Sequence, residues 1–179
     1  MERSRDVPPL QGSHTFQSQC SAVMRTVATT LGLAWWPSFY RDQVFWVAIL
    51  AGGSFWLGLS LWFPIHPITL EQVLSQAFLS RVIFYPALEE LLFRGYLQGQ
   101  LRQQSWGRQG WGGLTLANGC TSLLFAAGHW WSHPPLWAAA VLLPSLTFGY
   151  CRDRYMSLYP CIVLHMFYNA GYFALTGLP

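Results

Sequence analysis

Residues 78–101, FLSRVIFYPALEELLFRGYLQGQL, place two adjacent carboxylates and an arginine in the middle of a long apolar run. These three groups are Glu89, Glu90 and Arg94. An ionised side chain at the centre of a lipid bilayer costs about 2.5–3.5 kcal/mol on insertion scales. If the run crosses a membrane, all three groups therefore need partners, a water-filled cavity or a chemical role.

The spacing of these residues predicts separate roles for the two carboxylates. On a helix Glu90 and Arg94 are four residues apart, so they share a face and can pair. Glu89 is rotated from Glu90 by about 100° and is free to face a cavity. The alternative is that both carboxylates only neutralise arginine, but one arginine cannot neutralise two buried carboxylates. Pro86, one turn earlier, cannot donate a backbone hydrogen bond to Val82 and should disturb the helix there.

The composition is that of a membrane protein. Of the 179 residues, 53% are hydrophobic and only 9% are charged, whereas a soluble domain carries about 25% charged residues. Aromatic side chains make up 17% of the chain and gather at the ends of the apolar runs, as in the aromatic belts of membrane interfaces. The ten basic residues, all arginine, form no patch suited to nucleic acid. We therefore expect the lipid bilayer, and not a nucleic acid, as a partner.

The apolar runs predict an all-α fold, a polytopic transmembrane helix bundle with about five spans. A bilayer core about 30 Å thick needs about 20 apolar residues per helix. We expect residues 1–43 to form a polar N-terminal segment with an interfacial helix in residues 22–40, and residues 44–179 to form the core. The expected spans are residues 44–63, 78–101, 114–131, 136–151 and 159–175, with a Gly-rich loop at 102–113 and an Arg-bearing loop at 152–158.

The distribution of arginine predicts the orientation. The N-terminal region, residues 102–113 and residues 152–158 carry arginine, whereas residues 64–77 and 132–135 carry none. The positive-inside rule then places the N-terminus in the cytoplasm and the C-terminus outside. Residues 1–21 lack the apolar core of a cleavable signal peptide.

Two further apolar segments carry polar groups that complement the acidic pair. Residues 125–129, FAAGH, end at His129, and residues 165–169, HMFYN, place His165 and Asn169 on one helix face. A lone histidine at a helix end is more often an interfacial residue, and a buried His–Asn pair can simply cross-link helices. We expect these three side chains to converge with the acidic pair on one cavity, because each is costly at membrane depth.

The remaining histidines and the cysteines carry weaker signals. His14, His66 and His133 lie in expected loops and have no partner at useful spacing. The cysteines show no metal-ligand spacing and are interpreted as structural thiols. They are Cys20, Cys120, Cys151 and Cys161.

The motifs EExxxR, FxxxH and HxxxN, in this order on successive helices, resemble the CAAX-protease and bacteriocin-processing (Abi) family of glutamic-type intramembrane proteases. The resemblance covers residues 78–175 and implies a hydrolase that needs no metal or other cofactor. It implies that Glu89 and His129 activate a water molecule, and that His165 and Asn169 stabilise the oxyanion. The implied supporting residues of the site are Glu90, Arg94 and Phe125.

The resemblance also implies the substrate, a membrane-anchored protein that is cleaved within the bilayer. The small size and the expected topology are similar to those of bacterial members that act near a C-terminal sorting helix, and this likeness implies a location in a bacterial inner membrane. Since His129 lies near the outer end of its span, we expect the cavity between the middle of the membrane and the outer leaflet.

Three alternatives remain open on the sequence alone. Glu89, His129 and His165 form an adequate ligand set for a zinc-dependent intramembrane protease, although the HExxH motif is absent. A non-enzymatic immunity or scaffold membrane protein could keep the polar cluster for folding or partner binding. A proton-coupled transporter is expected to show paired half-repeats, which this chain lacks.

Overall fold

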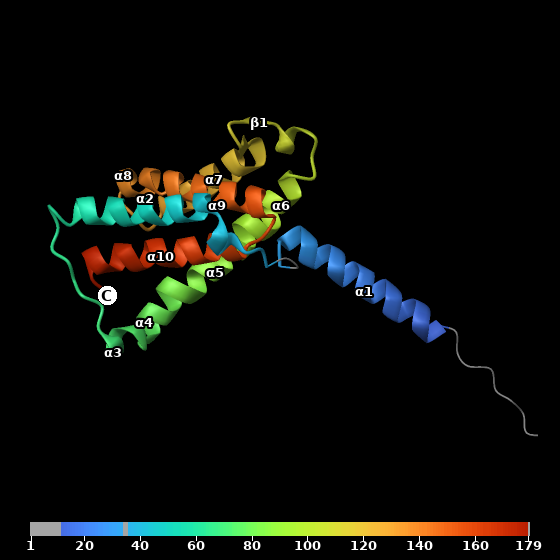
Figure 1. Cartoon of the computed structure of the whole chain (residues 1–179), viewed down its shortest axis with the longest axis horizontal. Helices are drawn as coiled ribbons and strands as arrows, with labels where there is room; N and C mark the ends of the chain where they lie inside the picture. The colour runs from blue at the N-terminus through green and yellow to red at the C-terminus, as the bar shows by residue number, and fades with distance from the viewer. Residues whose placement is uncertain (1–11, 34–35, 179) are drawn as a thin grey trace, which may run out of the picture.

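The computed structural model describes residues 12–33 and 36–178, with side chains from residue 17 onward, and it is a bundle of helices (Figure 1). The predicted all-α class is confirmed, with one two-stranded hairpin added. Among the described residues, no helix is both long enough and apolar enough to cross a membrane.

Helix α10 (Tyr159–Thr176) lies at the centre of the bundle. It packs against α9 (Leu142–Tyr155), α2 (Gln43–Leu59), α5 (Tyr85–Glu90) and the preceding segment η2 (Leu79–Phe84). Helix α7 (Leu116–His129) packs on α9, followed by the short α8 (Pro135–Ala140). The buried apolar cluster where α2, α9 and α10 meet consists of Phe39, Phe45, Ala48, Phe148, Cys151, Tyr155, Cys161 and Leu164.

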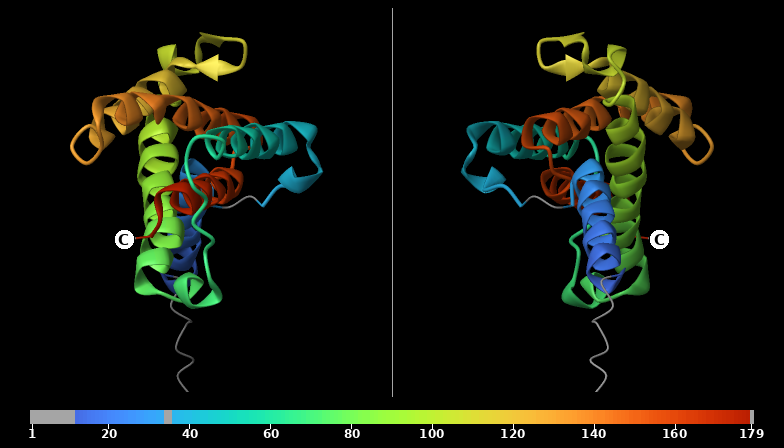
Figure 2. Two further views of the ribbon diagram at one scale, coloured as in Figure 1. Left: turned by 90° about the vertical axis from the view of Figure 1, so that its left-hand side faces the viewer. Right: turned by 90° about the vertical axis from the view of Figure 1, so that its right-hand side faces the viewer.

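The acidic segment forms one uninterrupted helical rod that alternates between α- and π-helix (Figure 2). Its parts are α4 (Gln76–Phe78), the π-helical η2 (Leu79–Phe84), α5 (Tyr85–Glu90), the π-helical η3 (Leu91–Leu97) and α6 (Gln98–Leu101). The rod begins two residues before the expected span because Ser75 caps it, its hydroxyl accepting from the N–H of Phe78. The N–H of Tyr85 bonds the carbonyl of Ser80, five residues back, so the wider π turn accommodates the missing N–H of Pro86.

The N-terminal helix differs from the one expected at residues 22–40. Helix α1 covers Gly12–Leu31, and residues 1–11 of the predicted polar segment lie outside the described residues. The helix ends at Gly32, whose φ is 76°, well before Pro37. The N–H groups of Gly32 and Leu33 bond the carbonyls of Thr29 and Ala28, which is the Schellman arrangement that a glycine C-cap allows.

Only the end of α1 reaches the rod, and two glycines make this contact possible. A Cβ at Gly99 would lie 2.8 Å from the carbonyl oxygen of Thr30, and one at Gly95 would lie 3.2 Å from that of Leu31. In Figure 1 the rest of α1 extends away from the bundle. The Gly95-xxx-Gly99 pattern therefore serves close backbone packing.

The expected fourth span and the loop after it are corrected by the structure. Residues 136–151 do not form one helix but belong to α8 and α9, and α9 continues to Tyr155. The Arg152-Asp153-Arg154 sequence is therefore helical, and the chain leaves the helix at Met156, with φ 52°. These charged side chains can lie on a helix because they contact groups on other elements. Arg152, for example, donates to the carbonyl of Thr30 at 2.7 Å.

The last of these arginines connects α9 to the start of α2. Arg154 donates to Asp42 at 2.8 Å, and Asp42 also caps α2 by accepting from the N–H of Val44. The hydrogen bond from Arg154 is the main reason that the pKa of Asp42 lies below its usual value.

A hairpin that the sequence analysis missed joins the end of the predicted Gly-rich loop to the first two residues of the expected third span, which becomes helical only at Leu116. Strands β1 (Gly110–Trp111) and β2 (Leu114–Thr115) pair antiparallel, with Gly110 opposite Thr115. Gly112 and Gly113 both have positive φ, 61° and 85°, as a two-residue hairpin turn requires. The remaining short elements are η1 (Phe39–Arg41), α3 (Leu70–Val73) and η4 (Trp106–Arg108).

The packing of α7 on α9 depends on Gly149. A Cβ at Gly149 would collide with the side chain of Asn118, which itself donates to the carbonyl of Leu146 and accepts from Ser122.

We expect Gly149→Ala to lower the free energy of unfolding by about 1–3 kcal/mol, as overpacking does. Gly119→Ala is the control, because its Cβ would meet nothing within 4 Å. This control should stabilise the helix by about 0.5–1 kcal/mol. Thermal unfolding of the purified variants measures both, and equal midpoints would contradict the packing argument.

Candidate active site

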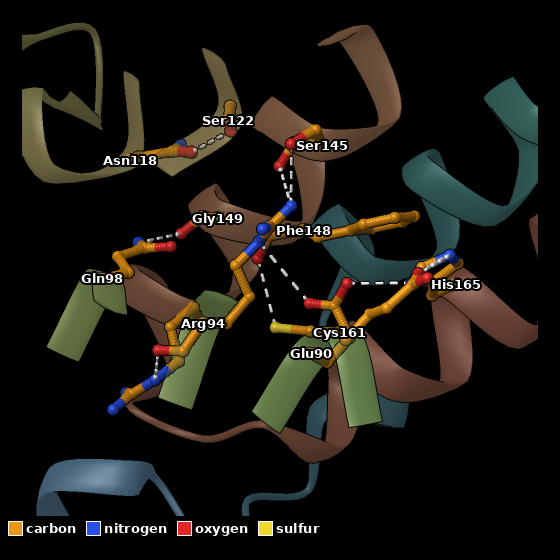
Figure 3. A network of polar contacts seen from close by, with 12 residues as sticks. Glu90, Arg94, Gln98, Asn118, Ser122, Ser145, Phe148, Gly149, Cys161 and His165 are labelled. Atoms are coloured by element: carbon orange, nitrogen blue, oxygen red, sulfur yellow. Dashed lines mark hydrogen bonds and ion pairs between the residues drawn. The ribbon is translucent and has the colours of Figure 1, made fainter. Parts of the chain in front are cut away.

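The centre of the site is the carboxylate of Glu90, whose side chain has no exposed surface. Its Oε1 lies 2.9 Å from Nδ1 of His165, and its Oε2 lies 3.5 Å from Nε of Arg94 (Figure 3). The 3.5 Å contact is an ion pair longer than a hydrogen bond. The predicted pairing of Glu90 with Arg94 is confirmed, and His165 is a second partner that the spacing did not indicate. Because Glu90 pairs with Arg94, we assign its carboxylate as ionised; such a group only accepts hydrogen bonds, so we assign the proton of this contact to Nδ1 of His165.

Arg94 is fully buried and makes contacts with two other helices. Its Nη2 donates to the carbonyl oxygen of Ser145 at 3.1 Å and to the hydroxyl of Ser145 at 2.8 Å. Its guanidinium carbon lies 4.9 Å from the centroid of the Phe125 ring and 5.9 Å from that of Phe148. Hydrogen bonds and ring faces together offset the cost of burying this charge.

His165 lies between the two carboxylates. Its Nε2 is 3.6 Å from Oε2 of Glu89, while Phe148 stacks on the imidazole with ring centroids 4.9 Å apart and planes 21° apart. The side chain of His165 is 6% exposed and that of Glu89 is 37% exposed. Glu90 and Phe148 hold the ring, so Nε2 is presented to the one carboxylate of the pair that has exposed surface.

His129 is fixed by its own helix. Its Nδ1 lies 2.9 Å from the carbonyl oxygen of Phe125, so Nδ1 donates, and in the neutral ring Nε2 remains an acceptor. His129 is also within electrostatic range of Glu89. His133 lies in a loop as predicted, but the interpretation that it has no partner was wrong. Its ring lies 5.6 Å from that of His129, and its Nδ1 lies 2.9 Å from the hydroxyl of Ser132.

Asn169 lies one turn after His165 on α10 and is half-buried. Its Nδ2 donates to the carbonyl oxygen of Arg81, in η2, at 3.0 Å. The amide thus uses one of its two N–H groups to connect α10 to the rod that carries the acidic pair.

Phe125 is the side chain that connects the three motifs. It is 2% exposed, and its ring centroid lies 4.6 Å from that of His129 and 5.8 Å from that of His165. Together with the cation contact from Arg94, the Phe125 ring places the EExxxR, FxxxH and HxxxN motifs around one point. Asn169 donates to the carbonyl oxygen of Arg81, and the contact of its motif with the Phe125 ring is made by His165.

Several residues of the site were missed by the sequence analysis. Ser145 and Phe148 come from α9, which carries none of the three motifs, and Gln98 extends the polar contacts by donating to Gly149 at 2.9 Å and to Asp153 at 2.8 Å. The spacing of Ser145 and Gly149 is a small-xxx-small pattern, and this pattern is the one signal that could have identified this face of α9.

An apolar pocket of about 140 Å³ lies further along α10. None of the four predicted catalytic residues lines it. Its lining residues are Trp56, Leu59, Phe63, Trp137, Tyr172, Leu175 and Thr176. Within the described part of the chain, no three His, Cys, Asp or Glu side chains are arranged to hold a metal ion.

Comparison with known protein families agrees with this geometry. The family model of the type II CAAX prenyl endopeptidases, Rce1-like, matches residues 71–171. The match covers more than half of the chain, so the protein belongs to this family of endopeptidases, and it is a hydrolase. The family resemblance predicted from the three motifs is confirmed. Neither the comparison with curated proteins nor that with solved structures found a match.

The two adjacent carboxylates should differ sharply in what they contribute to stability. Glu90→Gln should lower the free energy of unfolding by about 3–5 kcal/mol, because it leaves the buried Arg94 without its counter-charge. Glu89→Gln should cost far less, because the side chain of Glu89 is 37% exposed. Chemical denaturation of both isosteric variants, followed by circular dichroism, measures the difference. Equal losses would contradict the assignment of Glu90 as the structural carboxylate.

Proposed function

We propose that this protein is a glutamic-type intramembrane endopeptidase in which Glu89 activates the attacking water. The observation that carries the proposal is the position of Glu89, a carboxylate with exposed surface whose Oε2 lies 3.6 Å from Nε2 of His165. A general base must be accessible to its substrate and lie within reach of the groups that share its proton. Glu90 fails the first condition, because its carboxylate is fully buried and is engaged with both Arg94 and His165.

The proposed reaction uses each motif residue at a defined atom. Glu89 takes a proton from water as the water oxygen attacks the peptide carbonyl, and Nε2 of His129 accepts the second hydrogen bond of that water. The oxyanion that forms accepts hydrogen bonds from Nε2 of His165 and from the second N–H of Asn169. The C–N bond then breaks, and the proton held by Glu89 passes to the leaving amine.

This role of His165 requires an imidazolium. Nδ1 already donates to Glu90, so a ring that also donates from Nε2 carries both protons and a positive charge. The two carboxylates are then balanced by the cations of Arg94 and His165. The cluster of these four side chains is electrically neutral in this state, which lowers the cost of burying Glu90, Arg94 and His165.

A membrane location is supported by the distribution of polar and apolar side chains. Polar groups fill the interior, whereas large apolar side chains are exposed along the helices, which is costly in water and favourable in lipid. Fully buried polar side chains include those of Glu90, Arg94, Gln98, Asn118, Thr121, Ser122 and Ser145. Exposed apolar side chains on α2 include those of Val47, Leu50 and Leu57, each more than 60% exposed.

The substrate class follows from this location. We propose a membrane-anchored protein that is cut close to a C-terminal helix, with residues 44–179 as the protease core and a bacterial inner membrane as the site of action. The arginine distribution supports a cytoplasmic N-terminus and an extracytoplasmic C-terminus.

Glu89→Gln should abolish proteolysis while the protein remains folded. We expect turnover to fall by about 10²–10⁴-fold, the usual contribution of a general base. The assay is release of a folded reporter domain from a panel of reporters, each anchored by a single C-terminal apolar helix, in cells that express the protease. Glu71→Gln, a change at an exposed glutamate of α3, is the control and should retain full activity. Full activity of Glu89→Gln would refute the role of Glu89 as the base.

A chelator distinguishes the zinc-dependent alternative. We expect EDTA and o-phenanthroline to leave proteolysis by the purified protein unchanged. Complete inhibition that added Zn²⁺ reverses would favour a metalloprotease with Glu89, His129 and His165 as ligands.

The orientation can be tested by cysteine labelling, since Ser105 and Ser132 are both exposed and lie in loops expected on opposite sides. In intact cells expressing a variant without its native cysteines, Ser132→Cys should react with a membrane-impermeant maleimide and Ser105→Cys should not. The reverse pattern would invert the topology and remove the argument for an exported substrate.

A further inference from the structure

The carbonyl of Arg81 has a partner that a regular helix would not give it. In a helix this carbonyl accepts from the N–H four residues later in the α form, or five residues later in the π form. Those positions are Tyr85 and Pro86. The N–H of Tyr85 is bonded to Ser80, and a proline has no N–H. The carbonyl of Arg81 is therefore open to a donor from outside the rod, and Nδ2 of Asn169 fills this position at 3.0 Å.

This contact fixes the orientation of the Asn169 amide. A carbonyl oxygen only accepts hydrogen bonds, so the NH₂ group of the amide, and not its oxygen, must face Arg81. One N–H is held by Arg81, and the second is directed away at the fixed angle of a planar NH₂ group. Without this anchor the amide could rotate by 180° and present its oxygen, which would repel an oxyanion.

We propose that Pro86 is a positioning residue for the oxyanion donor Asn169. By removing one backbone N–H, Pro86 leaves the carbonyl of Arg81 free to hold the Asn169 amide in its donating orientation. Pro86 is fully buried in the rod, one turn before Glu89. The hydrogen bond from Asn169 to Arg81 therefore also connects α10 to the helix that carries the base. The catalytic part of this inference rests on the proposed function, whereas the contact between Pro86, Arg81 and Asn169 does not.

The kinetic test compares Pro86→Ala with Asn169→Ala. An alanine at this position restores an N–H, and in either helix form the Arg81 carbonyl then gains a backbone donor that competes with Asn169. We expect Pro86→Ala to lower kcat about tenfold or more with KM changed less than twofold, and Asn169→Ala to lower kcat by about 10²–10³-fold. The double variant should be no slower than Asn169→Ala alone, because Pro86 acts through Asn169. Pro144→Ala, in α9, is the control and should leave kcat unchanged.

A second measurement does not need activity. Asn169→Ala leaves the Arg81 carbonyl without a donor and should lower the thermal unfolding midpoint by about 3–8 °C. In the Pro86→Ala background the same change should lower the midpoint by less than half as much, because the backbone now satisfies that carbonyl. If the wild-type protein shows no proteolysis but the effect of Asn169→Ala on the midpoint still depends on Pro86, the proposed function is wrong and the contact between Asn169 and the Arg81 carbonyl is supported.

Two results would overturn the inference. Equal losses of midpoint from Asn169→Ala in both backgrounds would show that Pro86 and Asn169 are independent. Coupled midpoints with an unchanged kcat in Pro86→Ala would show that the contact stabilises the fold without positioning the oxyanion donor.

Discussion

The structure depends on the buried carboxylate of Glu90, which holds two cationic or protonated side chains from two directions. One oxygen accepts from Nδ1 of His165 on α10, and the other pairs with Arg94 one turn further along the rod. Arg94 in turn donates twice to Ser145 on α9. A single carboxylate therefore fixes the rod, α9 and α10 relative to one another. Because each partner is buried, removing any one leaves a charge or a polar atom that nothing else can satisfy.

This arrangement gives the neighbouring residues Glu89 and Glu90 different environments. Glu90 is fully buried and engaged, whereas Glu89 keeps exposed surface and faces the other nitrogen of the same imidazole. The stacking of Phe148 on His165 holds the plane of the imidazole ring. With Nδ1 held by Glu90, Nε2 is then held in a fixed position beside Glu89. A reactive group on a rigid helix, supported by a second layer of contacts, is held more precisely than one on a loop.

The polar interior continues from the site toward the hairpin end of the bundle. Asp153 accepts from Gln98 at 2.8 Å and from Thr115 at 2.7 Å, and it pairs with Arg102 at 3.1 Å. Arg152 meanwhile joins α9 to both the rod and the end of α1, by donating to the carbonyls of Arg94 and Thr30. Polar groups that are satisfied by one another fix the relative positions of helices in a way that apolar packing alone does not.

The sequence predicted most of the helices, because long apolar runs and their interruptions determine where helices lie. It also predicted the ion pair of Glu90 and Arg94, since a spacing of four residues on one helix is a local property. The contact of His165 with Glu90 could not be predicted in this way, because it joins residues 75 apart in the sequence. Whether Glu89 is the base, and whether Asn169 supplies the oxyanion donor, remain predictions of the family resemblance.

The errors have local physical causes. Three consecutive charged residues, Arg152 to Arg154, suggested a loop, but their partners lie on other elements and keep them helical. The N-terminal helix was expected to extend to residue 40 because the glycine cap at Gly32 was not recognised. The hairpin turn at Gly112 and Gly113 was interpreted as part of a Gly-rich loop, although two adjacent glycines are also the signal for a tight turn.

The central claim is that Glu90 holds His165 in the orientation that presents Nε2 to Glu89. Nitrogen-15 NMR of protein labelled at histidine, with the His165 signals assigned by His165→Gln, tests this claim most directly. The account predicts that Nδ1 of His165 is protonated and hydrogen-bonded, and that its resonance moves in Glu90→Gln but not in Glu71→Gln. An unprotonated Nδ1, or a resonance that Glu90→Gln leaves unchanged, would contradict it.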